Sequence, residues 1–196
     1  MNENTTKSKI LETMYDLVAQ KGYDKASMGQ IAQSIGIKKA SIYYYFKSKE
    51  DIFVQLVENL YRNDYAERSE SLSQENNGDS FRQELISKGE AFIDSYYENK
   101  NLRKVYAEID IQTSRIPELK ELVEAADAKF NQFLIKRMER GVEVGAFPQD
   151  FDTKLNAEIL YTLLVGIDQV ILYDLPVDPK AVWNEMILKL FGGKVS

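Results

Sequence analysis

Residues 27–50 read SMGQIAQSIGIKKASIYYYFKSKE, and this stretch decides how the N-terminal part of the chain folds. A capping-box pattern, Ser27 to Gln30, opens an apolar run that ends at Gly36. Glycine suits a turn after a helix because it adopts a positive φ without a steric penalty. The spacing therefore predicts two short helices joined by a turn, over about 28–35 and 39–45.

Two short helices joined by a glycine turn have the geometry of a helix-turn-helix, whose second helix lies in the DNA major groove. The apolar side chains expected to lock the two helices together are Ile31, Ala32, Ile35, Ile37 and Ile42. On the second helix, one face carries Lys39, Ala40, Tyr43 and Tyr44. Lysine ammonium groups and tyrosine hydroxyls suit phosphate oxygens, which favours DNA binding. Alternatively, the aromatic run simply packs a small helical domain, because aromatic residues are more often core.

The charge of the chain is unevenly distributed. The net charge is −6, which is unusual for a nucleic-acid binder. Residues 1–50, however, carry eight lysines against five carboxylates, whereas residues 51–196 carry 17 basic and 26 acidic side chains. A basic head on an acidic body indicates that only the head meets a polyanion, although chance scatter of surface charge remains an alternative.

The composition excludes several kinds of chemistry. The 196 residues are 44% hydrophobic and 29% charged, which is typical of a globular protein of one or two domains. The chain has no Cys and no His, which excludes disulfides, thiol catalysis, Ser-His-Asp triads and His-ligated or Cys-ligated metals. We therefore expect no metal, no cofactor and no enzymatic activity. A carboxylate enzyme is a further alternative, but the acid pairs are spaced i, i+2 and diverge on a helix.

The rest of the chain is also helical by its apolar spacing, and no strand alternation or internal repeat is visible. We expect an all-α protein of about nine helices, with a polar loop at Gln74–Asp79 and a capping box from Ser80 to Gln83. The further predicted helices cover about 6–21, 48–72, 80–98, 101–113, 117–144, 153–173 and 179–191.

The last two predicted helices have apolar faces too wide for a single core. We expect a symmetric partner helix to cover the excess, although burial in the chain's own domain is the alternative. A carboxylate at mid-bilayer costs about 2.5–3.5 kcal/mol, so Glu158 and Asp168 oppose a membrane span, and the polar N-terminus favours a cytoplasmic protein. The predicted homodimer interface comprises Leu160, Leu163, Leu164, Ile167, Ile171, Trp183 and Ile187.

About the first 55 residues resemble the TetR family of bacterial transcriptional regulators, in order and without a gap. The matching segments are Ile10–Glu12, Lys21–Tyr23, Ser27–Ala32 and Gly36–Glu50, and a weaker match lies at Gly141–Phe147 with Asp152. The resemblance implies an N-terminal three-helix helix-turn-helix DNA-binding domain, residues 1–50. A long helix would join it to a helical ligand-binding and dimerisation domain, residues 51–196.

The resemblance also implies DNA-contact roles. Lys39 is implied as a base or phosphate reader, Ala40 as the small residue that permits close approach, and Ser27 and Lys49 as phosphate contacts at helix N-termini. Ser41, Tyr43, Tyr44 and Tyr45 are implied as residues that position the helix on the DNA backbone. The sequence departs from the family pattern at Lys38, which cannot cap a helix by accepting a hydrogen bond, at Ala40, and at Gly29, where an arginine is frequent.

The predicted function is that of a ligand-responsive DNA-binding regulator, a repressor released from a palindromic operator by a small molecule. The alternative is a helical interaction adaptor that has lost DNA binding. The expected partners are double-stranded DNA, a second copy of the chain and an effector that is at least partly apolar, with no membrane. Candidate effector-pocket residues are Phe92, Tyr96, Tyr106, Ile109, Phe130, Phe133 and Tyr161.

Overall fold

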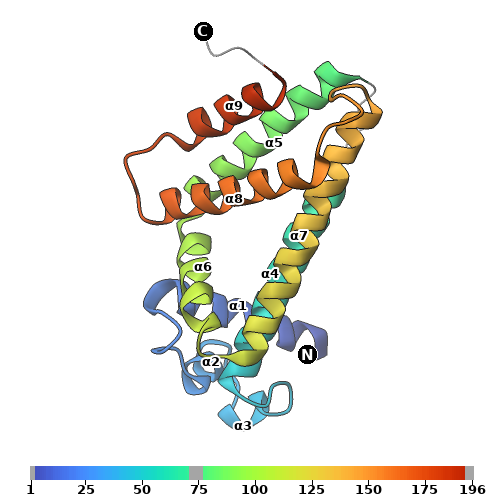
Figure 1. Cartoon of the computed structure of the whole chain (residues 1–196). Coiled ribbons are helices and arrows are strands. Elements are labelled where there is room, and N and C mark those ends of the chain that lie inside the picture. Colours follow the sequence, from blue (N-terminus) through green and yellow to red (C-terminus); the bar gives the residue numbers. More distant parts are fainter. Residues whose placement is uncertain (1–2, 71–76, 193–196) are drawn as a thin grey trace. The chain divides into compact units, whose positions relative to one another are not determined.

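The structure, a computed structural model, describes residues 3–70 and 77–192, and every regular element in these two ranges is an α-helix. The predicted all-α class is confirmed. The helices of the described ranges are α1 (Glu3–Lys21), α2 (Met28–Ser34), α3 (Lys39–Ile42), α4 (Lys49–Glu70), α5 (Gly78–Glu98), α6 (Lys100–Thr113), α7 (Pro117–Glu143), α8 (Thr153–Leu172) and α9 (Pro179–Leu190) (Figure 1).

The helices form two compact units that do not divide at residue 50. Unit 1 comprises Met1–Ser71 and Lys100–Ala126, and unit 2 comprises Leu72–Asn99 and Asp127–Ser196. The predicted boundary at residue 50 lies inside unit 1, whose core also includes apolar side chains of α4, α6 and the first part of α7. A domain boundary read from a local motif misses such contributions from later segments.

The core of unit 1 is organised around α1. Ile10, Met14 and Val18 recur every four residues and are at most 1% exposed. They pack in one cluster with buried side chains of α4 and α6. The helix ends at Gly22, whose φ of +84° places it in the left-handed region. Glu108 of α6 lies over this turn, with its Oε1 only 2.7 Å from the position that a Cβ at Gly22 would occupy.

The core of unit 2 is built where α5 packs against α9, with α8 beside them (Figure 1). Trp183 of α9 is 4% exposed, and its Nε1 donates a hydrogen bond to the Leu85 carbonyl at 3.1 Å. The indole reaches this position because Gly89 of α5 has no side chain: a Cβ there would lie 2.0 Å from the Trp183 ring. This contact fixes the spacing of the two helices.

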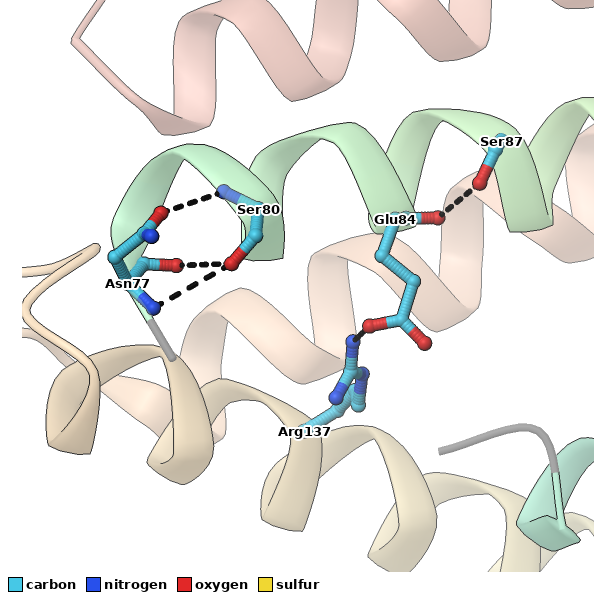
Figure 2. Close-up of polar contacts among 5 residues, drawn as sticks. All are labelled: Asn77, Ser80, Glu84, Ser87 and Arg137. Atoms are coloured by element: carbon cyan, nitrogen blue, oxygen red, sulfur yellow. Dashed lines mark hydrogen bonds and ion pairs between the residues drawn. The ribbon is translucent and has the colours of Figure 1, made fainter. Parts of the chain in front are cut away.

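The start of α5 differs from the prediction. The helix begins at Gly78, because Asn77 rather than Ser80 is its cap: Asn77 Oδ1 accepts a hydrogen bond from the Ser80 N–H at 2.9 Å (Figure 2). Ser80 Oγ in turn accepts from the Asn77 N–H at 3.4 Å. Asparagine caps as well as serine does, and the earlier start adds hydrogen-bonded residues. Residues 74–76 of the predicted loop lie outside the described residues.

A buried ion pair ties α5 to α7. The Arg137 guanidinium donates to a Glu84 carboxylate oxygen, and the two side chains are only 7% and 9% exposed (Figure 2). The guanidinium also lies over the Phe81 ring, 4.7 Å from its centroid. Removing one partner of such a pair leaves an uncompensated buried charge and costs about 3–5 kcal/mol. The pair therefore specifies the register of the two helices.

The alternative that α8 is buried entirely within its own domain does not hold for the single chain. One side of the helix faces the core of unit 2, but Leu155 and Ile159 on the other side are 52% and 39% exposed. Within the described residues, α8 is also the one helix that is long and apolar enough to cross a membrane, judged by length and composition alone. The described residues therefore leave the outer apolar side of α8 uncovered.

The contact between Gly89 and Trp183 predicts the effect of a single added methyl group. Gly89→Ala should lower the free energy of unfolding by about 1–3 kcal/mol, because the indole must leave its position. The control is Gly29→Ala on α2, where a Cβ would meet only Ser27 Oγ at 4.0 Å. This control should gain about 0.5–1 kcal/mol from helix propensity. Denaturant unfolding measures both, and a Gly89→Ala protein as stable as wild type would contradict the packing described.

Candidate nucleic-acid interface

The helix-turn-helix of unit 1 is held by apolar side chains beneath it. Ile31 and Ile42 are fully buried, and Phe46 is 1% exposed. The turn closes through Gly36, whose φ is +71°, and through a hydrogen bond from the Ile37 N–H to the Ala32 carbonyl at 3.0 Å. The predicted locking of the two helices is confirmed in this geometry.

The second helix is shorter than predicted. α3 covers only Lys39–Ile42, and Tyr43–Tyr45 form the turn that follows. Lys38 occupies the N-cap position and makes no side-chain capping bond, as its chemistry requires. A helix this short is not stable by its own hydrogen bonds, so its place depends on the buried Ile42.

The outward face of the α3 region carries most of the residues implied as DNA contacts. Tyr43 and Tyr44 are 53% and 75% exposed, and the remaining exposed members are Lys39, Ala40 and Ser41. Tyr45 differs, because it is half-buried and packs against the core of unit 1, with the Tyr44 ring edge-on at 5.1 Å. The structure therefore brings Lys39, Tyr43 and Tyr44 together on one surface and turns Tyr45 toward the interior.

Two of the implied phosphate contacts are engaged inside the unit. The Lys49 Nζ donates to the Tyr23 carbonyl at 3.1 Å and lies 4.1 Å from the centroid of the Tyr23 ring. The Ser27 hydroxyl is bonded to Gln30 within the first turn of α2. The Lys49 partner is 26 residues away along the chain, so no local pattern could have revealed it.

The electrostatics of this surface favour an anion. Asp24 is paired with Arg115 at 3.3 Å, and Asp51 accepts hydrogen bonds from the Lys47 N–H at 2.7 Å and from Gln55 Nε2 at 2.6 Å. These acids are thus occupied. In the described part of the chain Lys38 and Lys39 have no ion-pair partner. Two adjacent free ammonium groups beside exposed tyrosines form a surface suited to phosphate oxygens.

Unit 2 contains a separate cluster of aromatic side chains. The ring centroid of Phe130 lies 6.1 Å from that of Phe133 and 6.2 Å from that of Tyr161. The ring centroids of Phe92 and Tyr96 are 4.8 Å apart. Five of the predicted effector residues are therefore in unit 2. Tyr106 and Ile109 instead belong to unit 1, where Ile109 is 1% exposed in the core, so the structure does not gather all seven in one unit.

A carboxylate adjoins these rings. Tyr161 and Asp127 share a side-chain hydrogen bond, in which the phenol donates. Desolvation raises the pKa of the Asp127 carboxyl, and the hydrogen bond from Tyr161 lowers it. Desolvation also raises the pKa of the Tyr161 phenol, and the Asp127 charge adds to this shift. Asp127 could not be predicted from the sequence, because a single acid on a helix carries no distinctive pattern.

The open side of α8 forms a groove with α9. The groove has a volume of about 700 Å³. It is lined by Leu155, Glu158, Ile159, Thr162, Leu163, Gly166, Ile167, Val170, Val177, Pro179, Val182 and Met186. Only Glu158 and Thr162 in this lining carry polar side chains.

The predicted dimer interface lies only partly in this groove. Of the predicted interface residues, Leu163 and Ile167 line the groove. Six are at most 7% exposed in the core of unit 2, and they are Leu160, Leu164, Ile167, Ile171, Trp183 and Ile187. α8 is apolar on nearly all sides, so sequence periodicity does not distinguish its inner face from its outer face.

With this geometry in place, comparison with known proteins defines the class. Residues 10–56 match the model of the family "Bacterial regulatory proteins, tetR family". The all-helical fold agrees with that of a TetR transcription regulator from Haloarcula marismortui, with a TM-score of 0.80 at 15% identity over 98% of this chain and all of that one. The predicted resemblance is thereby confirmed: residues 10–56 match the model of the TetR family.

Particular relatives add detail. The chain is 42% identical over 55 residues to the negative transcriptional regulator IcaR of the biofilm operon icaADBC from Staphylococcus epidermidis. The match covers 28% of this chain and 30% of that relative's length. A transcriptional regulator from Saccharomonospora viridis, solved in complex with choline, has a TM-score of 0.77 at 19% identity over 97% of both chains.

The environment of Tyr23 predicts a pH effect. Burial, with the nearby Glu50 and Asp24 carboxylates, raises the pKa of the Tyr23 phenol to about 12. The pKa of Tyr23 in the folded protein is therefore higher than the ordinary value of about 10 in the unfolded chain. The neutral phenol contributes stability that is fully present below pH 10 and is lost as the pH rises from about 10 to about 12. Tyr23→Phe should remove this loss.

At pH 7 the same substitution should not destabilise the protein. The Tyr23 hydroxyl is buried without a hydrogen-bond partner in the described residues. Its removal should leave the free energy of unfolding unchanged or raise it by up to about 1 kcal/mol. Thermal unfolding between pH 7 and pH 12 measures both effects, with the exposed Tyr44→Phe as control. A clear loss of stability at pH 7 in Tyr23→Phe would contradict the described environment.

Proposed function

We propose that the protein is a ligand-responsive DNA-binding transcriptional regulator, a repressor that a small molecule releases from its operator, and that it acts in the cytoplasm. The observation that carries the proposal is the exposed surface of Lys38, Lys39, Tyr43 and Tyr44 above a buried helix-turn-helix core. Two comparisons support it: the family model matches residues 10–56, which include this surface, and the relative IcaR is named as a negative regulator.

Substitution of Lys39 tests whether the protein distinguishes between DNA base sequences. It opens α3, from which an ammonium group can donate to guanine O6 and N7. Lys39→Ala should lose discrimination at one base pair of each half-site, by about 1–3 kcal/mol. The measurement is a mobility-shift titration on DNA from upstream of the protein's own gene and on its single-base variants, at several salt concentrations. An equal loss on every sequence would make Lys39 a phosphate contact. No DNA affinity of the wild type at low salt would contradict the function itself.

We further propose that the α8–α9 groove is covered by the same groove of a second copy. A groove lined almost entirely by apolar side chains, with Leu155 about half exposed, gains from burial in a partner of the same shape. A lipid bilayer fits less well, because Glu158 would enter the hydrocarbon with the groove. A two-fold dimer also suits a palindromic operator with half-sites on one side of the DNA.

Substitution in the groove tests this dimer. Wild type should have about twice the 22.6 kDa chain mass in light scattering at micromolar concentration. Leu163→Glu should shift the equilibrium to monomer, because an unpaired carboxylate would be buried in the interface. The control is Tyr97→Glu on α5, an exposed aromatic position outside the groove lining. A monomeric wild type, or a Leu163→Glu protein that stays dimeric, would overturn the proposal.

We place the effector site at the aromatic cluster of unit 2 that includes Phe130 and Tyr161. Choline is the first probe, because a carboxylate beside aromatic rings suits an organic cation and because the neighbour from Saccharomonospora viridis was solved with choline. Phe130→Ala should weaken choline binding about 2- to 30-fold, measured by calorimetry.

The same calorimetry tests the coupling between choline binding and DNA binding. Because linkage is reciprocal, operator DNA should weaken choline binding by the factor by which choline weakens DNA binding. The neutral analogue 3,3-dimethyl-1-butanol is the control for charge. Choline binding that is insensitive both to Phe130→Ala and to DNA would exclude this site as the regulatory one.

A further inference from the structure

The interior of α8 contains a glycine that no neighbour in the described chain requires. Gly166 is exposed and lies more than one turn from either end of the helix. A glycine in a helix interior makes the helix less stable than an alanine does. A Cβ built at Gly166 would meet no atom within 4 Å beyond the backbone of its own helix and its two chain neighbours, so a side chain would find open space there.

Two other glycines in helix interiors of unit 2 have a reason within the chain. At Gly89 a Cβ would lie 2.0 Å from the Trp183 ring, and at Gly141 it would lie 2.5 Å from the Phe147 ring. Each of these glycines therefore makes room for an aromatic ring of the same chain. Gly166 makes room for nothing in the described residues, which favours a use for this space by a partner outside the chain.

Gly166 forms a notch in the groove between α8 and α9. Leu163 and Val170, three residues before it and four residues after it, line the groove on the same face of α8. Between these two side chains the helix surface is bare backbone. Thr162 needs no hydrogen bond from an occupant, because its hydroxyl donates to the Glu158 carbonyl of the same helix at 2.8 Å. The notch therefore suits an apolar partner that approaches closely.

A helix of a second copy fits this notch. Helix axes usually pack about 8–10 Å apart, and the side chains at the contact set the distance. In a two-fold dimer, the residue at the point where the two α8 helices cross meets its own counterpart. With Gly166 at that point, neither helix has a side chain at the crossing. Every other residue of the groove lining would hold the two backbones further apart.

We propose that the two α8 helices of the dimer cross at Gly166, in contact through their backbones, and that this glycine determines how tightly the two copies associate. The inference rests on the proposed dimer and names the residue on its two-fold axis. A side chain at Gly166 would separate the helices and would pull the flanking Leu163 and Val170 side chains away from the partner.

The chain has no cysteine, so a single introduced thiol reports on this crossing directly. In Gly166→Cys the two thiols of a dimer should form a disulfide, which requires Cα atoms about 4.4–6.8 Å apart. Mild oxidation at micromolar concentration should give a covalent dimer on a non-reducing gel. The controls are Val165→Cys, exposed on α8 outside the groove lining, and Leu155→Cys, about three turns away along the groove. Neither control should cross-link.

A larger side chain tests whether the close approach matters for affinity. Gly166→Leu should raise the dimer dissociation constant about 5- to 100-fold in sedimentation experiments, because overpacking separates the two helices. Val165→Leu is the matched control and should associate as wild type.

Gly166→Ala separates an effect on the interface from an effect on folding. In the wild-type chain it should weaken the dimer by less than Gly166→Leu does. In the Leu163→Glu chain, which we expect to be monomeric, it should instead raise the denaturant concentration at the unfolding midpoint, because alanine favours the helix. A purely structural role of Gly166 would lower this midpoint.

The outcomes are distinct. If wild type is dimeric and Leu163→Glu is monomeric, but Gly166→Leu associates as tightly as wild type or Gly166→Cys does not cross-link, the inference is overturned while the proposed dimer stands. Cross-linking through Leu155→Cys in place of Gly166→Cys would put the crossing elsewhere and overturn it as well. If wild type is monomeric at micromolar concentration, the proposed dimer fails and this inference fails with it.

Discussion

The burial of Ile42 and Phe46 against the core of unit 1 is the constraint on which the proposed DNA surface depends. α3 has only four residues and no side-chain cap, so its own hydrogen bonds cannot hold it. The two buried side chains anchor it from below, and α1, α4 and α6 supply the core into which they pack. Because Ile42 and Phe46 point inward, Lys39, Tyr43 and Tyr44 are left on the outside. The chemistry of the surface is thus a consequence of packing beneath it.

Unit 2 uses a different set of constraints to leave a surface open. The Gly89–Trp183 contact and the Arg137–Glu84 pair fix α9 and α7 against α5, so the inner side of α8 is fully used within the chain. Its outer side remains apolar and exposed. Gly89 and the Arg137–Glu84 pair each constrain the sequence, because either could be replaced only with a compensating change in the neighbouring side chains.

Sequence patterns predicted most helices and failed where tertiary contacts decide. Apolar periodicity located the helices to within a few residues, and the outward face of α3 followed from the spacing of Ile42 and Phe46. Most residues of the predicted dimer interface lie in the core of unit 2, because the apolar periodicity of α8 does not distinguish its inner side from its outer side. The engagement of Lys49 with Tyr23, and of Arg115 with Asp24, depends on residues that are distant in the chain. The Asn77 cap was missed because Ser80 offered an equally good local signal.

If the exposed face beginning at Lys38 and Lys39 meets DNA, bound DNA should shield these lysines from acetylation, which mass spectrometry detects. The protein is labelled alone and in the presence of a DNA duplex at low salt. DNA should protect Lys38 and Lys39 from labelling, whereas the exposed Lys154 of α8 should be labelled equally in both samples. Unchanged labelling of Lys38 and Lys39 while DNA is bound would show that this face does not meet DNA.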